Sequence, residues 1–265
     1  MENKNIWTLI TGASSGIGYR YAEELAAQGY NLLLVSNEEP LLSETAGQLA
    51  RQYGVETRPL YMDLATSDAA DRLYATCQDW NIRIDLLINN AGMYRFGETL
   101  DIERDFTAKM IALHVLTPTK LCLLFGKDMR RQRHGYILNM SSMTAWLAYP
   151  GINVYGATKC YLKHFSRGLH TELRDYGVNV TAVCPGAVDT DLYNLNGKRR
   201  RLLVRLGIML PPEKLARRAI HALFRDKAVL VPGLLNRLVL ALTPLIPHSV
   251  IRRMARRTNI LPLHE

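Results

Sequence analysis

Cysteine is scarce in this chain of 265 residues, and its four cysteines form no recognisable metal or disulfide pattern. None of them lies in a CxxC motif, so their spacing indicates neither a structural zinc site nor a disulfide framework. We therefore expect a cytoplasmic, reducing environment and no bound metal. The cysteines are Cys77, Cys122, Cys160 and Cys184.

Long apolar runs are also missing. The first apolar segment, residues 5–11, is too short for a signal peptide and continues directly into a predicted strand. The last one, residues 234–246, is short and is interrupted by Asn236, Arg237 and Pro244. Because a bilayer-spanning helix needs about 20 apolar residues, we expect that this segment does not span a membrane.

Acidic residues are rare in the last quarter of the chain. Residues 198–265 contain 15 Lys and Arg against 3 Asp and Glu, a net charge of +12, whereas residues 1–197 carry a net charge of −3. The larger part of the chain is therefore slightly acidic, and it contains no recognised nucleic-acid motif. General nucleic-acid binding is excluded on these grounds.

Seven short apolar segments alternate with longer amphipathic ones. Several are nearly continuous Val, Ile and Leu, which is typical of parallel strands buried on both faces. The predicted strands are residues 5–11, 31–36, 55–62, 84–89, 135–141, 178–184 and 228–232. The predicted helices are residues 17–28, 41–53, 66–80, 103–131 and 157–176. This alternation predicts an α/β fold with a doubly wound parallel seven-stranded sheet flanked by helices.

No internal repeat, low-complexity segment or linker occurs before about residue 190. We therefore expect a single domain over residues 1–232, followed by a basic amphipathic helical extension over residues 233–265.

A glycine-rich turn, TGASSGIG at residues 11–18, lies between the first predicted strand and a predicted helix. Gly12, Gly16 and Gly18 permit a tight turn, close approach to a pyrophosphate and packing of the helix on the strand. The helix N-terminus would offer free N–H groups and a partial positive charge to the phosphates. An ordinary turn before a helix is the alternative, but the context matches a dinucleotide-binding fingerprint.

A tyrosine and a lysine lie four positions apart in VYGATK, residues 154–159. In a helix, Tyr155 and Lys159 share one face, and the ammonium group would lower the pKa of the phenol from its usual value of about 10. Such a tyrosine can act as a general acid or base near neutral pH. For this pair alone, a solvated helix face with an aromatic neighbour is the alternative.

Five motifs together make the chain resemble the short-chain dehydrogenase/reductase family. They follow the family's order: TGASSGIG at 11–18, NNAG at 89–92, a serine at 142, YxxxK at 155–159 and PGAVDT at 185–190. The glycine spacing is GxxxGxG rather than the commoner GxGxxG. The resemblance covers residues from about 5 to 232. It implies a Rossmann-type NAD(P)-binding catalytic domain that transfers a hydride between a nicotinamide cofactor and a carbonyl or alcohol substrate.

The resemblance assigns the chemistry to three side chains. Ser142 would hydrogen-bond the substrate oxygen, with neighbouring Ser141 as the alternative. Tyr155 would donate the proton in reduction and accept it in oxidation. Lys159 would lower the pKa of Tyr155 and bind the nicotinamide ribose hydroxyls.

One helix position departs from the family pattern. Related enzymes carry an asparagine whose main-chain carbonyl holds a water linked to the lysine, and here the residue is His114. We include His114 among the candidate catalytic residues and predict that activity survives, with a pH profile shifted by a group that titrates near neutrality. A buried histidine satisfied by hydrogen bonds is the alternative.

The resemblance also implies a set of nucleotide contacts. Asp63 would meet the adenine amino group, although a surface-turn aspartate is the alternative. Thr190 would reach the carboxamide or a phosphate. The other implied contacts are Gly12, Ser14, Ser15, Gly16, Ile17, Gly18, Ser36, Asn37, Leu64, Asn90, Ala91, Gly92, Tyr155, Lys159, Pro185, Gly186 and Val188.

The sequence VSNEEP, which follows the second predicted strand, leaves the choice of cofactor close to balanced. Ser36 and Asn37 can donate hydrogen bonds to a 2′-phosphate without repelling it, yet no basic residue supplies a counter-charge. Glu38 or Glu39 could bind a ribose if the loop is displaced by one residue. We slightly favour NADP(H) over NAD(H).

Residues 190–212 would cover the substrate, and their apolar side chains favour a lipophilic carbonyl compound, such as a 3-oxoacyl chain or a polycyclic ketone. An amphipathic helix packed on the domain is the alternative. Many relatives are dimers or tetramers, so we expect a homo-oligomer. A catalytically silent NAD(P)-binding regulatory protein is the competing function. The apolar residues are Leu192, Leu195, Leu202, Leu203, Leu206, Ile208 and Met209.

The extension, residues 233–265, combines an apolar stretch with arginines at helical spacing. Such a sequence is typical of an interfacial helix, which would place the protein at the inner face of an anionic membrane. Packing on a partner subunit or over the substrate pocket is the alternative, and from the sequence alone we prefer it. The arginines are Arg252, Arg253, Arg256 and Arg257.

Overall fold

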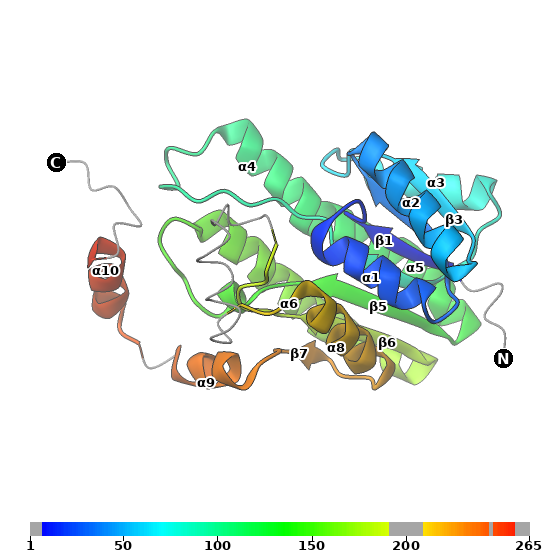
Figure 1. Ribbon diagram of the computed structural model, residues 1–265. Helices are drawn as coiled ribbons and strands as arrows, with labels where there is room; N and C mark the ends of the chain where they lie inside the picture. Colours follow the sequence, from blue (N-terminus) through cyan, green and yellow to red (C-terminus); the bar gives the residue numbers. More distant parts are fainter. Residues whose placement is uncertain (1–6, 191–208, 244–245, 258–265) are drawn as a thin grey trace.

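Seven parallel strands form one sheet in the order β3-β2-β1-β4-β5-β6-β7 (Figure 1). The computed structural model describes residues 7–190, 209–243 and 246–257. The strands are β1 (Trp7–Thr11), β2 (Asn31–Ser36), β3 (Thr57–Tyr61), β4 (Ile84–Asn89), β5 (Gly135–Met140), β6 (Val178–Val183) and β7 (Val229–Leu230). The predicted doubly wound sheet is confirmed, and the order reverses between β1 and β4.

Helices connect the strands, and they differ in part from the prediction. They are α1 (Gly16–Ala26), α2 (Glu39–Tyr53), α3 (Ala69–Asp79), α4 (Arg104–Ile111), α5 (Thr117–Gln132), α6 (Asn153–Leu173) and α8 (Pro212–Phe224). Of these, α4–α5 and α6 differ from the prediction, while α8 was not predicted. A π-helical turn, Ala112–Leu116, joins α4 to α5 where one uninterrupted helix was predicted. Helix α6 begins at Asn153, earlier than predicted, and therefore includes Tyr155. After β7 the chain forms α9 (Leu234–Leu242) and α10 (His248–Arg257).

Alternate residues of the central strands supply the two sides of the sheet. In β2, Leu32 and Leu34 belong to the core under α1, α2 and α8, whereas Leu33 and Val35 belong to the core under α3, α5 and α6. Strands β1, β2 and β4 are buried along their whole length, as their composition predicted. Each fully buried leucine contributes about 2 kcal/mol, so these two cores carry the stability of the fold.

Strand β3 forms one edge of the sheet and is only partly buried. Its Pro59 pairs with Leu34 of β2. Because proline lacks the N–H group that a central strand needs, an edge strand is where it can be accommodated.

The helical stretch Arg104–Gln132 has the length and apolar composition of a membrane-spanning helix. Its α5 part, however, packs on β4 and β5 and buries Leu121, Phe125 and Met129 in the core. These contacts account for its apolar composition as that of a core helix.

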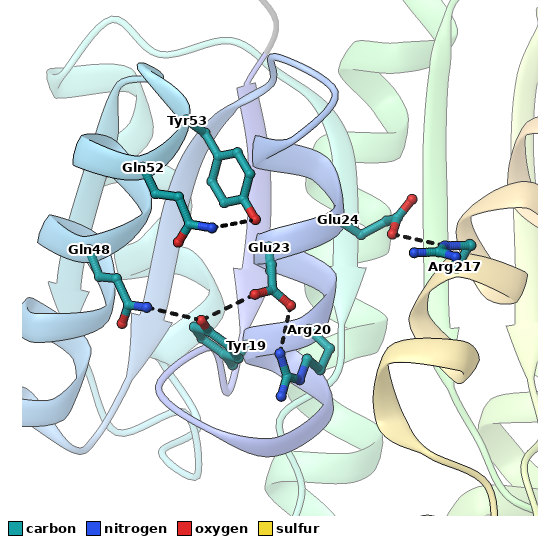
Figure 2. Close-up of polar contacts among 8 residues, drawn as sticks. All are labelled: Tyr19, Arg20, Glu23, Glu24, Gln48, Gln52, Tyr53 and Arg217. Carbon is teal, nitrogen blue, oxygen red and sulfur yellow. Dashed lines mark hydrogen bonds and ion pairs between the residues drawn. The ribbon is translucent and has the colours of Figure 1, made fainter.

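Polar side chains bridge the outer surfaces of α1, α2 and α8 (Figure 2). Gln48 of α2 donates a hydrogen bond to the Tyr19 hydroxyl of α1 (3.4 Å), and Arg217 of α8 pairs with Glu24 of α1 (3.4 Å). Exposed contacts of this kind contribute at most about 1 kcal/mol each, so the helical layer is held chiefly by its buried leucines and alanines.

Gly18 is the tightest point of the packing between β1 and α1. A β-carbon at this position would lie 1.9 Å from the Gly12 carbonyl oxygen. We expect Gly18→Ala to lower the free energy of unfolding by about 2 kcal/mol, because the backbone of the glycine-rich turn must shift. Urea denaturation measures the change.

The matched control is Gly168→Ala in α6, where an added β-carbon meets no atom within 4 Å among the described residues. This variant should be more stable than the native protein by about 0.5–1 kcal/mol, because alanine is the better helix former. Equal stability of the two variants would contradict the packing assigned to Gly18.

Candidate functional site

A cleft of about 550 Å³ opens at the carboxyl ends of the strands, where the strand order reverses. Ligands of doubly wound folds bind at such a reversal. The cleft is lined by every residue predicted to contact the nucleotide except Gly18, which is buried against the Gly12 carbonyl. The structure thus brings the scattered motifs together in one place.

Thr11 and Asn90 fasten the glycine-rich turn to the turn after β4. The Thr11 hydroxyl accepts hydrogen bonds from the N–H groups of Asn90 (2.9 Å) and Ala91 (3.0 Å) and donates to the Ile88 carbonyl (3.3 Å). The Asn90 amide donates in return to the carbonyls of Thr11 (2.9 Å) and Gly12 (3.2 Å). The amide nitrogen of Asn90 is therefore engaged in holding the cleft together.

The glycine-rich turn exposes the start of α1 to the cleft. Gly12 has φ +65°, and a β-carbon there would come within 2.9 Å of the Ala91 backbone. Ser15 precedes the first turn of α1 and is exposed, and its side chain makes no capping hydrogen bond. Free N–H groups at such a helix start can bind an anionic group.

A hydrogen-bonded group of three side chains lies where β2 ends. The Ser14 hydroxyl contacts the Ser36 hydroxyl (2.9 Å) and donates to the Glu38 carboxylate (2.7 Å). The Ser36 oxygen also accepts the Glu38 N–H (3.3 Å). Glu38 and Asn37 both line the cleft, so this part of the wall carries a negative charge.

Asp63 follows β3, and its carboxylate makes a turn contact at the edge of the cleft. Its carboxylate accepts the Ala65 N–H (2.9 Å), which is an ordinary turn contact. The residue also lines the cleft and is exposed, so an oxygen remains accessible to a ligand.

Tyr155 and Lys159 lie one turn apart on α6, and both line the cleft. The Lys159 Nζ is 5.5 Å from the centre of the Tyr155 ring and donates a hydrogen bond to the Met140 carbonyl at the end of β5 (2.9 Å). Burial lowers the pKa of Lys159 to about 8. The ammonium group is therefore still mostly charged at neutral pH, beside the phenol.

Ser141 and Ser142 both line the cleft, but their hydroxyl groups are engaged differently. Ser141 donates to the Lys159 carbonyl (2.7 Å), which uses its proton to fasten α6 to β5. Ser142 accepts the Thr144 N–H (3.2 Å), and its own proton goes to no partner within the part of the chain that the structure describes. Of the two, Ser142 can donate to a ligand without breaking a contact.

His114 is buried behind the cleft and does not belong to its described lining. Its Nε2 accepts the Met93 N–H (3.0 Å), so the ring proton lies on Nδ1 and is donated to the Thr158 hydroxyl (3.0 Å). Thr158 donates onward to the Tyr155 carbonyl (2.8 Å). Burial, and secondarily the charge of Lys159, lowers the pKa of His114 well below 6.5. The predicted titration near neutrality is therefore wrong, and the hydrogen-bonded buried histidine is what the structure shows.

Several lining residues were not predicted from the sequence. Met62 and Met140 lie at the carboxyl ends of β3 and β5, a position that could have pointed to them. Lys109 and Leu113 come from α4 and the π-helical turn, for which the sequence offers no signal.

The apolar segment predicted to cover the substrate falls mostly on residues 191–208, outside the described residues. Of its predicted members, Met209 is described and is buried. Leu210 follows and pairs with Ala187 and Asp189 through backbone hydrogen bonds (2.9 and 3.0 Å), beside the PGAVDT motif.

The low pKa of His114 predicts a pH-dependent stability. Below pH 6.5 the unfolded chain binds a proton at this histidine that the folded protein does not bind, so acid favours unfolding. Between pH 7.5 and 5.5 we expect the native protein to lose about 1 kcal/mol more unfolding free energy than His114→Asn does. Urea denaturation at the two pH values measures the difference. The exposed His164→Asn should behave like the native protein, and the same pH dependence in His114→Asn would refute the assignment.

Comparison with known proteins agrees with this architecture. A family model for short chain dehydrogenases matches residues 6–200. Human very-long-chain 3-oxoacyl-CoA reductase is 35% identical over 190 residues, which are 70% of this chain and 60% of that protein. The match thus spans only about three fifths of the length of these curated reductases.

Solved structures resemble the chain over most of its length. A short-chain dehydrogenase from Sphingobium yanoikuyae in complex with NADPH is 31% identical, with a TM-score of 0.77 over 86% of this chain and 88% of that one. A 7β-hydroxysteroid dehydrogenase is 26% identical, with a TM-score of 0.86 over 96% and 98%. On the family model, the sequence identity and the shared sheet, this chain belongs to the short-chain dehydrogenase family.

Proposed function

We propose that this protein is an oxidoreductase that uses a nicotinamide cofactor to interconvert a carbonyl compound and the corresponding alcohol. The observation that carries the proposal is the placement of Ser142, Tyr155 and Lys159 in the same cleft as the glycine-rich turn. The cleft suits a dinucleotide, because the turn leaves no β-carbon at Gly12 and exposes the start of α1 to a pyrophosphate. A bound nicotinamide ring would supply or accept the hydride.

Side chains of this chain would hold and transfer the proton. Ser142 donates a hydrogen bond to the substrate oxygen and holds it near the Tyr155 phenol. Tyr155 then gives its proton to that oxygen in reduction, or accepts it in oxidation. The nearby ammonium group of Lys159 stabilises the phenolate that remains, and general acid–base catalysis of this kind contributes roughly 10²–10⁴-fold to the rate.

We further propose a lipophilic carbonyl substrate. The ring of Tyr94 packs edge-on against Tyr155 at 5.2 Å between ring centres, which gives the reactive phenol an aromatic neighbour. Trp146, four positions after Ser142, is 36% exposed and stacks against the Lys163 ammonium group at 3.8 Å. The names of the relatives, a very-long-chain 3-oxoacyl-CoA reductase and a 7β-hydroxysteroid dehydrogenase, point in the same direction.

Three observations bear on the form of the cofactor, and they do not agree. The NADPH complex of the Sphingobium relative and the exposed Asn37, whose amide can donate to a phosphate, support our slight preference for NADP(H). Glu38 opposes it, because its carboxylate is held beside Ser14 and would repel a 2′-phosphate there. We therefore propose a preference for NADP(H) over NAD(H) that the charge of Glu38 keeps small.

Removal of the Glu38 charge tests this account of the cofactor. We expect Glu38→Gln to raise kcat/KM for NADPH by about tenfold and to change the value for NADH less than about twofold, since only the phosphate is repelled. Glu39→Gln, at the next position, is the control and should alter neither. A native protein that prefers NADH strongly would overturn the proposed NADP(H) preference.

Steady-state kinetics on a carbonyl panel tests the reaction itself. The panel runs from short sugars to long-chain 3-oxoacyl thioesters, and we expect the highest kcat/KM at the lipophilic end. Tyr155→Phe should lower kcat by roughly 10²–10⁴-fold while nucleotide binding persists, because the phenol hydroxyl is removed and the other residues that line the cleft remain.

The control is Tyr161→Phe. Tyr161 lies on the same helix, but its hydroxyl contacts Thr119 instead of the cleft. This variant should keep native turnover. Nucleotide binding without turnover of any carbonyl, unchanged by Tyr155→Phe, would favour the competing function, a regulatory protein without catalysis.

A further inference from the structure

Helix α9 contributes nothing to the buried core, because none of its residues is buried. One side of the helix is nevertheless apolar, and its large side chains are between 41% and 83% exposed. Their spacing is that of a single helical face about 140° wide. The residues are Leu234, Leu235, Leu238, Val239 and Leu242. Figure 1 shows α9 and α10 outside the helices that cover the sheet.

The opposite side of α9 attaches it to the cleft. Asn236 and Leu240 are partly buried. A β-carbon on Gly186 would lie 2.9 Å from the Asn236 amide, so Asn236 packs directly on the Pro185–Gly186 turn that lines the cleft. The Asn236 amide also donates to the Pro232 carbonyl (2.7 Å). Helix α9 is thus fixed at the mouth of the cleft with its apolar face outward.

The charge around this face is positive. Arg237 on α9 and Arg252 and Arg253 on α10 are exposed. The sequence from residue 228 to residue 264 contains no acidic residue. A second copy of the chain would bring the same positive charge to the interface, whereas an anionic lipid surface supplies both an apolar phase and the opposite charge.

We propose that α9 and α10 dock this protein on an anionic phospholipid surface. The apolar face of α9 enters the boundary between headgroups and acyl chains, and Arg237, Arg252 and Arg253 lie at the lipid phosphates. The contact is peripheral and places the Pro185–Gly186 side of the cleft against the lipid. The exposure of α9 thus favours the membrane interpretation over packing within the subunit, and it does not depend on the proposed reaction.

Co-sedimentation of the full chain with vesicles tests the proposal. We expect binding to phosphatidylglycerol–phosphatidylcholine vesicles at low salt and weak binding to vesicles of phosphatidylcholine alone. Binding to the anionic vesicles should also be weak in 0.5 M NaCl, because a Debye length of roughly 4 Å screens the attraction between arginines and phosphates. Leu235→Glu/Leu238→Glu should weaken binding by at least about tenfold, because two charges enter the apolar face. Arg252→Gln/Arg253→Gln should do so by about tenfold or more, because each basic residue adds to the attraction.

The matched control is Leu41→Glu/Tyr61→Glu, which adds the same two charges at exposed apolar positions near β3, the opposite edge of the sheet. This control should bind vesicles like the native protein, and circular dichroism should show native folding for all variants. The proposal is overturned if the native chain stays in the supernatant at low salt. It is also overturned if Leu235→Glu/Leu238→Glu still binds vesicles but changes the molar mass in light scattering, which would assign α9 to a second copy.

Discussion

The hydroxyl group of Thr11 joins the two halves of the sheet at the point where the strand order reverses. It is hydrogen-bonded to one backbone group of β4 and two of the turn after it, and the Asn90 side chain donates back to the Thr11 carbonyl. A buried polar group left without a partner costs about 1–3 kcal/mol, so these contacts hold both turns in one arrangement. The cleft exists because the glycine-rich turn and the turn after β4 are fixed relative to each other. The same contacts orient the start of α1 toward the cleft.

The second constraint is the attachment of α6 to the sheet. The ammonium group of Lys159 is buried and donates a hydrogen bond to the Met140 carbonyl, while the Ser141 hydroxyl donates to the Lys159 carbonyl. The same first turns of α6 are linked through Thr158 to His114, which in turn holds the Met93 N–H after β4. Tyr155 therefore has its backbone fixed from two sides. A neutral histidine suits this task, because its two ring nitrogens can accept from one element and donate to another.

The sheet could be predicted because parallel strands buried on both faces are nearly continuous apolar runs in the sequence, as in NLLLVS of β2. The start of α6 could not, since Ile152 offers no capping side chain. The π-helical turn at Ala112–Leu116 has no compositional signal, and the amphipathic pattern runs through it. For the site, the motifs indicated which residues gather at the cleft. They could not separate a ligand contact from a structural one, as Asn90 illustrates, nor could they distinguish an exposed apolar face from a packed one in α9.

We propose that a hydride passes between a nicotinamide cofactor and a carbonyl carbon in this cleft. The most direct measurement uses NADPH and NADH deuterated at C4, in both stereochemical forms, with a long-chain 3-oxoacyl thioester, and analyses the product by mass spectrometry. We predict a product alcohol that carries one deuterium on the former carbonyl carbon for one stereochemical form of the cofactor. Cofactor binding detected by fluorescence, with no deuterium in any product across the carbonyl panel, would contradict the account.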